Sequence, residues 1–323
     1  MDNKKLFLGI EIGATKNQIA IGDEEGNILY SEIEKVIIED GAKGILNWLQ
    51  KTIPSVVKKQ MEFGGKISAI GVGFGGIIES STGKILISVQ VKGWQDFMLK
   101  NWLEENFKLP ATIINDTVTG GYAEYVYGSG KGSKQFFYTN IGSGIGGVFI
   151  LNGEYYDGLG YGAAYLGHTY IPDWTSTIPG TEKKVEDICS GWAIEKRLRS
   201  KGYVPDNSYI IKLCNGNLSE ISCAMLGNAA KQGDDFALSE LERVAKSFAT
   251  GLVNILTLVS PDCISIGGGV GKMGDILLNP IRKYVDELAF ISNKGKYKIV
   301  ECKFSDASVL VGSVLFASTL IKN

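Results

Sequence analysis

The chain contains the stretches LGIEIGATK (residues 8–16) and YTNIGSGIGG (residues 138–147), which share one pattern. In each, an apolar run ends in Ile-Gly, and a second run rich in β-forming residues follows. Glycine permits the positive φ of a tight turn and lets an anion approach the backbone amides. Two such turns, one in each half of the chain, indicate a weak internal duplication. They predict an α/β fold of two domains that face each other across a cleft.

The composition is that of a globular protein. With 323 residues, the chain is long enough for two domains, and 44% of its residues are hydrophobic. The net charge is −2 and the basic residues are scattered, which argues against a nucleic-acid or membrane partner. Glu11 cuts the first apolar stretch short of a signal-peptide core, so a cytoplasmic location is expected. The five cysteines form no CxxC pair and are expected to be reduced, buried thiols.

The pattern of apolar residues predicts alternating strands and helices. In the first half it predicts strands at 6–12, 17–22, 28–35, 66–74, 84–88 and 111–116, and helices at 41–63, 94–107 and 118–127. Pro54 is expected to interrupt the first helix. In the second half it predicts strands around 135–151, 262–269 and 297–304, and helices at 184–200, 218–232, 235–260, 275–289 and 307–321. The expected domains are 1–118 plus 307–323, and 119–306.

Three glycine clusters resemble phosphate-binding loops. GSGIGG (142–147) and GVGFGG (71–76) both match G-x-G-x-x-G, but β-rich sequence follows each of them. A dinucleotide site needs a helix directly after the glycines, so a dinucleotide-binding site is not expected here. Hairpin turns whose amides face a polyphosphate are the remaining functional reading, and plain tight turns are the alternative. The third cluster, at 267–269, suits a base or ribose lying against bare backbone.

The motifs GIEIGATK, NDTVTGGYAE, TNIGSGIGG, GAAYLGH, EDICSG, PDCISIGGG and VGSVLFA occur in the order seen in the ROK family (repressors, open reading frames and sugar kinases). The chain resembles this family over nearly its whole length. The first glycine turn begins by residue 9, which leaves no room for a preceding DNA-binding helix-turn-helix, so the kinase branch is expected. The resemblance implies two ribonuclease-H-like (actin-like ATPase) domains with a cleft between them that close on ATP.

The resemblance also implies roles for individual residues. Asp116 would be the general base on a sugar hydroxyl, and Glu11 would contribute indirectly to holding Mg²⁺. The residues implied for ATP binding are Gly13, Ala14, Thr15, Lys16, Gly142, Ser143, Gly144, Gly267, Gly268 and Gly269. The residues implied for sugar binding are Gly75, Gly76, Gln90, Asn115, Tyr165, His168 and Glu186.

Considered without the resemblance, the polar residues also fit purely structural roles. Asn115 and Asp116 precede a predicted helix, where an N-cap is common. His168 is the only histidine, and a lone histidine is by default a hydrogen-bonded structural residue. Glu186 begins a predicted helix, where an exposed carboxylate is favourable.

Several positions depart from the family pattern. Position 11 is Glu instead of Asp, which moves the carboxylate that supports the Mg²⁺ site. Tyr165 replaces the glutamate of E-x-G-H, and a phenol offers one hydroxyl in place of a carboxylate. Gln90 replaces an asparagine and Gly75 a proline. No cysteine lies between His168 and Glu186, so the zinc site of many family members is not expected.

These observations predict an ATP- and Mg²⁺-dependent kinase that phosphorylates a hydroxyl of a hexose or related sugar, with Asp116 as base. One alternative is a catalytically decayed sugar- or nucleotide-binding regulatory protein, and another is a phosphotransferase for a non-sugar acceptor. The resemblance further implies a homodimer.

Overall fold

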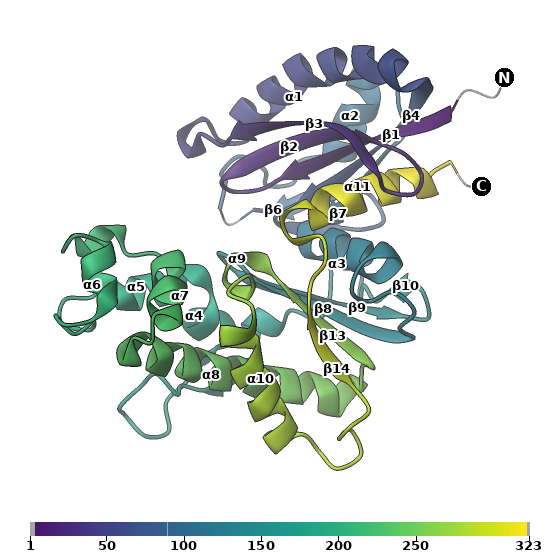
Figure 1. Ribbon diagram of the computed structural model, residues 1–323. Helices are drawn as coiled ribbons and strands as arrows, with labels where there is room; N and C mark the ends of the chain where they lie inside the picture. The colour runs from purple at the N-terminus through teal and green to yellow at the C-terminus, as the bar shows by residue number, and fades with distance from the viewer. Residues whose placement is uncertain (1–3, 89, 322–323) are drawn as a thin grey trace. The chain divides into compact units, whose positions relative to one another are not determined.

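The computed structural model describes residues 4–88 and 90–321. The chain divides into two compact units (Figure 1). Unit 1 comprises Met1–Gly128, Glu154–Ala163 and Asp306–Asn323, and unit 2 comprises Ser129–Gly153 and Ala164–Ser305. Each unit has its own sheet and its own hydrophobic core. The cleft expected between the units stays a prediction.

Unit 1 contains a mixed five-stranded sheet with the order β3-β2-β1-β4-β7. Strand β1 is antiparallel to β2 and parallel to β4, and β4 is parallel to β7. The strands are β1 (Lys4–Ile12), β2 (Lys16–Gly22), β3 (Ile28–Lys35), β4 (Gly65–Phe74), β7 (Ala111–Asn115) and the separate pair β5 (Ile77–Glu79) and β6 (Lys84–Ile87). The helices are α1 (Gly41–Lys58), α2 (Leu99–Phe107), α3 (Asp116–Tyr127) and α11 (Ser308–Thr319), with 3₁₀ turns η1 (Ile38–Asp40), η2 (Lys59–Phe63) and η5 (Ser305–Ala307).

The second five-stranded sheet has the corresponding order, β10-β9-β8-β13-β14. Its strands are β8 (Gln135–Ile141), β9 (Ile145–Leu151), β10 (Glu154–Tyr155), β13 (Cys263–Gly267) and β14 (Lys298–Glu301), beside the pair β11 (Tyr170–Pro172) and β12 (Glu182–Lys184). The remaining elements are η3 (Leu166–His168), α4 (Val185–Cys189), α5 (Gly191–Leu198), α6 (Tyr209–Leu213), η4 (Leu218–Glu220), α7 (Cys223–Lys231), α8 (Asp235–Val259), α9 (Gly268–Gly271) and α10 (Asp275–Leu288). Here β8 is antiparallel to β9 and parallel to β13, as β1 is to β2 and β4. The repeated topology confirms the duplication.

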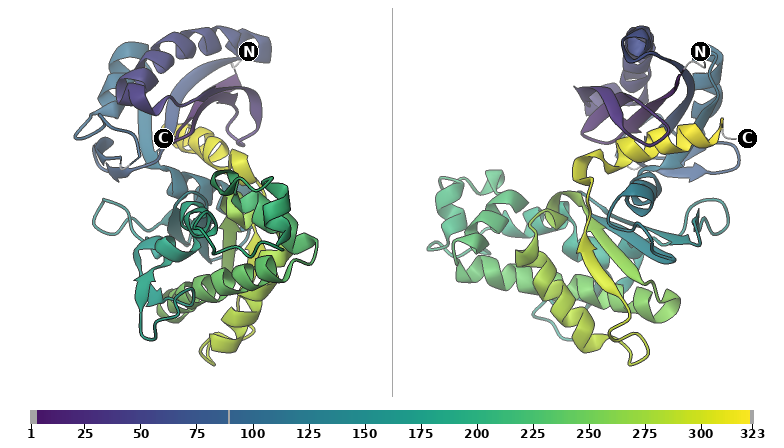
Figure 2. Two further views of the ribbon diagram at one scale, coloured as in Figure 1. Left: turned by 90° about the vertical axis from the view of Figure 1, so that its left-hand side faces the viewer. Right: turned by 45° about the vertical axis from the view of Figure 1, so that its right-hand side comes forward.

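Helix α11 packs directly against the first sheet and beside α3 (Figures 1 and 2). The packing requires glycine, because a Cβ on Gly71 would overlap the carbonyl of Ser313 and one on Gly312 would overlap the carbonyl of Thr119. Gly71 begins the GVGFGG motif, and it lies inside β4. Helix packing therefore explains the first glycine of this motif, and no dinucleotide-type turn is formed there.

Four helices differ from the expectations, and one of them, predicted at 218–232, begins only at Cys223 after the separate turn η4. Pro54 lies inside α1 without ending it, because residue 54 is exposed and water can reach the carbonyl that loses its partner. The helix predicted at 94–107 begins only at Leu99, and Trp94 is buried against Phe74 and Phe97 in the core of unit 1. The helix predicted at 184–200 is broken at Ser190, which has extended dihedrals and caps α5.

The boundary expected at residue 118 falls inside α3, whereas the structure groups all of α3 with unit 1. Two contacts hold this helix to α11. Ser308 Oγ donates to Glu124 Oε1 at 3.4 Å, and the rings of Tyr122 and Phe316 stack with centroids 4.5 Å apart.

Candidate active site

Three strands of unit 1 end at the same edge of their sheet. In the register of β1, β4 and β7, Ile12 pairs with Phe74 and Phe74 pairs with Asn115. Glu11 and Asp116 therefore lie at this edge, where parallel strands of α/β proteins present ligand-binding groups. The structure brings these two candidate residues of unit 1 together, and their charges are close enough to interact.

The turn between β1 and β2 is closed by its own backbone. The Gly13 amide donates to the Lys16 carbonyl at 3.2 Å, and the carbonyl of the exposed residue Thr15 accepts from Val36 at 3.0 Å. Ala14 lies half-buried in the same turn. The four residues expected to bind phosphate thus form one short hairpin turn at the edge of the sheet.

Glu11 is held by two neighbours on β2. Its Oε2 accepts from Gln18 Nε2 at 2.6 Å and lies 3.6 Å from Lys16 Nζ. Burial raises the pKa of Glu11, Lys16 and Gln18 oppose this effect, and the charge of Asp116 adds to it. The carboxylate therefore has a fixed position beside the turn.

Asn115 and Asp116 make different contacts at the start of α3. Asn115 is the N-cap of α3, because its Oδ1 accepts from the amides of Thr117 and Val118 at 3.0 and 3.2 Å. Its Nδ2 donates to the Gly76 carbonyl at 3.1 Å, which joins this cap to the end of β4. Asp116 is the first residue of the helix, and its Oδ1 accepts from the Thr117 amide at 2.7 Å.

Burial dominates the electrostatics of Asp116. It raises the pKa of the carboxyl to about 6, although the hydrogen bonds from Thr117 favour the ionised form. A Cβ added to Gly75 would lie 3.4 Å from Asp116 Oδ2, and the Gly75 amide donates to the Ile12 carbonyl at 3.0 Å. Gln90 is exposed.

In unit 2, the turn between β8 and β9 is held at both ends. Within it, the Gly142 amide donates to the Gly144 carbonyl at 3.0 Å. The Gly142 carbonyl accepts from the Gly191 amide at 2.7 Å, and the Ile145 amide donates to Glu186 Oε2, also at 2.7 Å. Ser143, at the tip, is exposed. Glu186, expected in the sugar site, is therefore also a partner of the phosphate turn.

The third glycine cluster lies beside this turn. Gly267 pairs with Asn140 on β8, and Gly268 follows with a φ of +85°. A Cβ on Gly268 would lie 2.5 Å from the carbonyl of Ile141, whereas nothing lies within 4 Å of one on Gly269. Glycine is required at position 268 because of the positive φ and because the Ile141 carbonyl leaves no space for a Cβ. The structure thus brings together the two glycine clusters that were expected at the nucleotide in unit 2.

Tyr165 precedes the turn η3, and His168 is its last residue. Their ring centroids are 6.2 Å apart, and the His168 amide donates to the Tyr165 carbonyl at 3.0 Å. His168 is exposed, and its Nδ1 lies 3.5 Å from Lys184 Nζ at the start of α4. Because α4 carries Glu186, the three sugar-site candidates of unit 2 belong to neighbouring segments. Asp116 belongs to unit 1, so its place beside them stays a prediction.

The carboxylates of unit 1 suit a magnesium ion that is held mainly by phosphates. Among residues 4–88 and 90–321, no group of three or more His, Cys, Asp or Glu side chains could hold a metal by itself. Magnesium keeps several waters and commonly takes one or two carboxylates together with substrate phosphates. Glu11 and Asp116 beside a glycine turn match that donor set.

The sequence did not single out the buried pair of Arg197 and Glu240 in unit 2. A signal was present, because Glu240 lies on the apolar face of its helix next to Leu241 and four residues before Val244. A charged residue on such a face is rarely buried unless it is paired.

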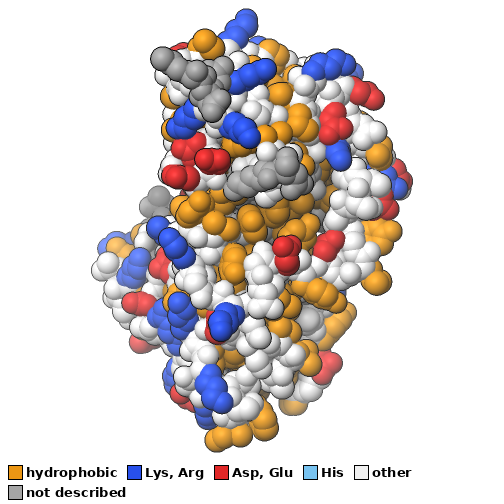
Figure 3. Space-filling view, turned by 90° about the vertical axis from the view of Figure 1, so that its right-hand side faces the viewer, with side chains coloured by type: hydrophobic (Ala, Val, Ile, Leu, Met, Phe, Trp, Pro, Cys, Tyr) orange, Lys and Arg blue, Asp and Glu red, His pale blue; other side chains and the backbone are white. Residues whose placement is uncertain are grey.

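The surface and the helices add two observations. On the face shown in Figure 3, basic side chains are scattered among acidic and uncharged ones and form no continuous basic surface. Within the described part of the chain, no helix combines the length and the apolar character needed to span a membrane.

Comparison with known proteins identifies one family. The family model described as ROK family matches residues 7–319. A glucokinase of Thermotoga maritima is 27% identical over 99% of this chain and 98% of its own length. A xylose repressor of Caldicellulosiruptor bescii is 25% identical over 95% of this chain and 77% of its own.

The fold has a close counterpart among solved structures. The crystal structure of a ROK family glucokinase from Streptomyces griseus, in complex with glucose and AMPPNP, superimposes with a TM-score of 0.81. The two chains are 26% identical, and the match covers 97% of this chain and 99% of the other. Two α/β units of the actin-like ATPase type are thereby confirmed as the fold class.

Proposed function

The chain belongs to the ROK family, and we propose that it is a kinase that transfers the γ-phosphoryl group of ATP to a hydroxyl of a hexose or related sugar. The observation that carries the proposal is Asp116, a half-buried carboxylate at the sheet edge whose pKa is raised to about 6 by loss of solvation. A carboxylate with such a pKa is ionised near neutral pH and is a stronger base than an exposed aspartate. The relatives named glucokinase support a sugar as acceptor.

In this mechanism Asp116 accepts the proton of the sugar hydroxyl as the oxygen attacks the γ-phosphorus. The amides of the turns at Gly13–Lys16 and Gly142–Gly144 bind the phosphates, and Gly267–Gly269 border the adenosine. A magnesium ion, when bound, supplies charge neutralisation on the phosphates, and Glu11 supports it. Lys16 adds a positive charge beside the same turn.

Seven residues are proposed to contact the sugar. Asn115, Gly75, Gly76 and Gln90 come from unit 1, and Tyr165, His168 and Glu186 come from unit 2. Tyr165 offers a hydroxyl in place of a carboxylate, so the accepted sugar differs in how its hydroxyls are recognised. We further propose a homodimer, on the family resemblance alone.

A regulatory binding protein is the second candidate, because a relative of similar identity is named a xylose repressor. Glu11 and Tyr165 are the departures that favour it. Retention of Asp116 at the sheet edge favours the kinase, since the loss of one pocket carboxylate alters recognition more readily than it removes phosphoryl transfer.

The test is ADP release from Mg-ATP in a coupled assay, with aldohexoses, ketohexoses and N-acetylated amino sugars as acceptors. We expect turnover with at least one sugar and a loss of about 10²-fold or more in Asp116→Asn. Asp206→Asn, at an exposed position of unit 2, is the control and should match the native protein. No sugar-dependent ATP consumption with any sugar in Mg²⁺ or Mn²⁺ would favour the binding protein.

A further inference from the structure

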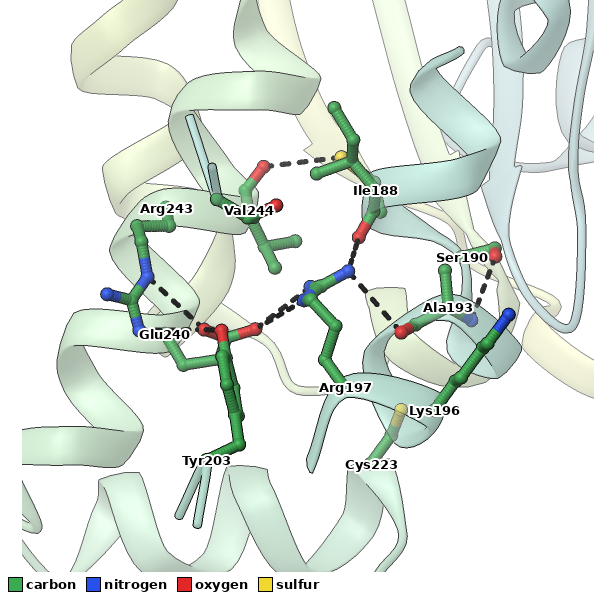
Figure 4. Close-up of polar contacts among 12 residues, drawn as sticks. Ile188, Ser190, Ala193, Lys196, Arg197, Tyr203, Cys223, Glu240, Arg243 and Val244 are labelled. Carbon is green, nitrogen blue, oxygen red and sulfur yellow. Dashed lines mark hydrogen bonds and ion pairs between the residues drawn. The ribbon is translucent and has the colours of Figure 1, made fainter. Parts of the chain in front are cut away.

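A buried charged cluster lies in unit 2 (Figure 4). The side chain of Glu240 on α8 is fully buried, and its Oε1 accepts from Arg197 Nε and Nη2 at 3.1 and 2.9 Å. Its Oε2 accepts from Tyr203 Oη at 2.8 Å and from Arg243 Nη2 at 2.9 Å. Burial opposes ionisation, but the charge of Arg197 and the bonds from Tyr203 and Arg197 outweigh it and lower the pKa of Glu240. The cluster is therefore ionised and paired on both carboxylate oxygens.

Arg197 also bonds to the backbone at the α4–α5 corner, by which we mean residues 185–198. Its Nη1 donates to the Ile188 carbonyl at 2.7 Å and to the Ala193 carbonyl at 3.4 Å (Figure 4). Ile188 lies in α4 and Ala193 lies in α5, on either side of the break at Ser190. A planar guanidinium with several donors suits such a role, whereas an ammonium lacks this fork.

The α4–α5 corner in turn holds the Gly142–Gly144 turn. Glu186, two residues before Ile188, accepts from the Ile145 amide, and the Gly191 amide donates to the Gly142 carbonyl. Both bonds measure 2.7 Å, and they lie at opposite ends of the turn. A continuous series of contacts thus runs from the buried carboxylate on α8 through Arg197 to the turn.

We infer that Arg197 is a positioning residue for the Gly142–Gly144 turn, because it anchors to Glu240 the corner that holds both ends of that turn. The inference rests on the proposed function in one respect, the binding of ATP phosphates by the turn. Displacement of catalytic groups by about 1 Å can lower a rate 10²-fold even when its cause lies far from the chemistry.

Arg197→Lys tests the inference, and Arg243→Lys is its matched control. Both variants keep a positive charge beside Glu240. Arg243 lies on α8, like Glu240, and pairs with the same carboxylate. Arg197 pairs with it too, but it also donates to the two carbonyls of the α4–α5 corner. The measurements are amide hydrogen exchange over residues 140–147, and kcat and KM for Mg-ATP at saturating sugar.

We expect Arg197→Lys to speed exchange in the turn and to raise the KM for ATP by about tenfold. Arg243→Lys should leave exchange in the turn unchanged and the KM within about twofold. Equal effects of the two variants, or no effect of Arg197→Lys on exchange in the turn, would overturn the inference. If Arg197→Lys does not fold, Glu240→Gln takes its place, and it should speed amide hydrogen exchange in the turn.

Failure of the proposed function has a different signature. If the native protein shows no sugar-dependent ATP turnover, the kinase assignment fails, while the exchange comparison still decides whether Arg197 positions the turn.

Discussion

The carboxylate of Glu186 accepts a hydrogen bond of 2.7 Å from the backbone amide of Ile145, 41 residues away in the sequence. The bond joins the start of α4 to the end of the glycine turn. It gives one side chain two expected tasks, contact with the sugar and support of the phosphate turn. Under the proposed function, binding of the sugar at Glu186 and order in the turn would be coupled.

This bond makes the choice of substitution at Glu186 informative. Glu186→Ala leaves the buried Ile145 amide without its partner, which costs about 1–3 kcal/mol of stability. Glu186→Gln keeps an acceptor oxygen and should cost less than about 1 kcal/mol. Urea unfolding followed in unit 2 measures both values.

Asp187→Ala is the control for that experiment, because Asp187 is the exposed neighbour of Glu186 on the same short helix. It should change stability by no more than about 0.5 kcal/mol. A cost for Glu186→Ala no larger than that of Asp187→Ala would show that the bond to Ile145 contributes nothing.

Local signals explain why much of the fold was predictable. Alternating apolar residues marked β1 to β3, and Gly13 and Gly142 marked the two tight turns. The sequence also showed the two similar hairpins, one in each sheet. These features need no information about distant contacts, so periodicity and turn chemistry suffice.

Features set by distant contacts were missed. Arg197, which donates to carbonyls on both sides of the break at Ser190, is held by Glu240, 43 residues away in the sequence. The second task of Glu186 depends on a partner on β9. The sequence could name Glu186 from resemblance, but it could not show that the same carboxylate caps a turn, because tertiary packing decides which donor is near.

Alanine substitutions at Gly268 and Gly269 should change stability in opposite directions. Gly268 has a φ of +85°, and a Cβ there would lie 2.5 Å from the Ile141 carbonyl, so Gly268→Ala forces the backbone to shift. We expect a loss of about 2 kcal/mol or more, from strain and overpacking together. Thermal unfolding at equal protein concentration provides the measurement.

Gly269→Ala is the internal reference, because a Cβ there meets nothing within 4 Å. It lies in helix α9, where alanine is favoured over glycine by up to about 1 kcal/mol. A midpoint for Gly268→Ala equal to that of Gly269→Ala would contradict the structural account of this loop.

The five cysteines are buried and form no disulfide, as the sequence predicted. Burial raises the pKa of Cys189 well above its ordinary value and that of Cys223 to about 12. Thiolate is the reactive form, so these thiols should react slowly with a disulfide reagent in the native protein. All 5 should react promptly in denaturant. A fast-reacting thiol in the native state would show that one of these sites opens.

Asp116 should link activity and stability to pH in opposite directions. Its pKa is raised to about 6 by burial, so the base is progressively protonated below that pH. We expect kcat/KM for the sugar to fall about tenfold per pH unit at pH values well below 6, and to level off above about 7. A profile that stays flat between pH 5 and 8 would remove Asp116 from the role of base.

The stability effect follows from the same shift. The folded state holds this proton more tightly than the unfolded state, whose carboxyl titrates near 3.8. Stability is therefore lost as pH rises from about 4 to 6, and ionised Asp116 lowers it at neutral pH by an amount on the order of 1–3 kcal/mol.

Asp116→Asn removes this cost, so the variant should be more stable than the native protein at pH 7.5 and nearly equal to it at pH 4. Thermal unfolding of both proteins at the two pH values gives the comparison. If the variant is inactive and also less stable at pH 7.5, the carboxylate supports the fold. If it is inactive but more stable, Asp116 acts as a base whose ionised form lowers the stability of the native protein.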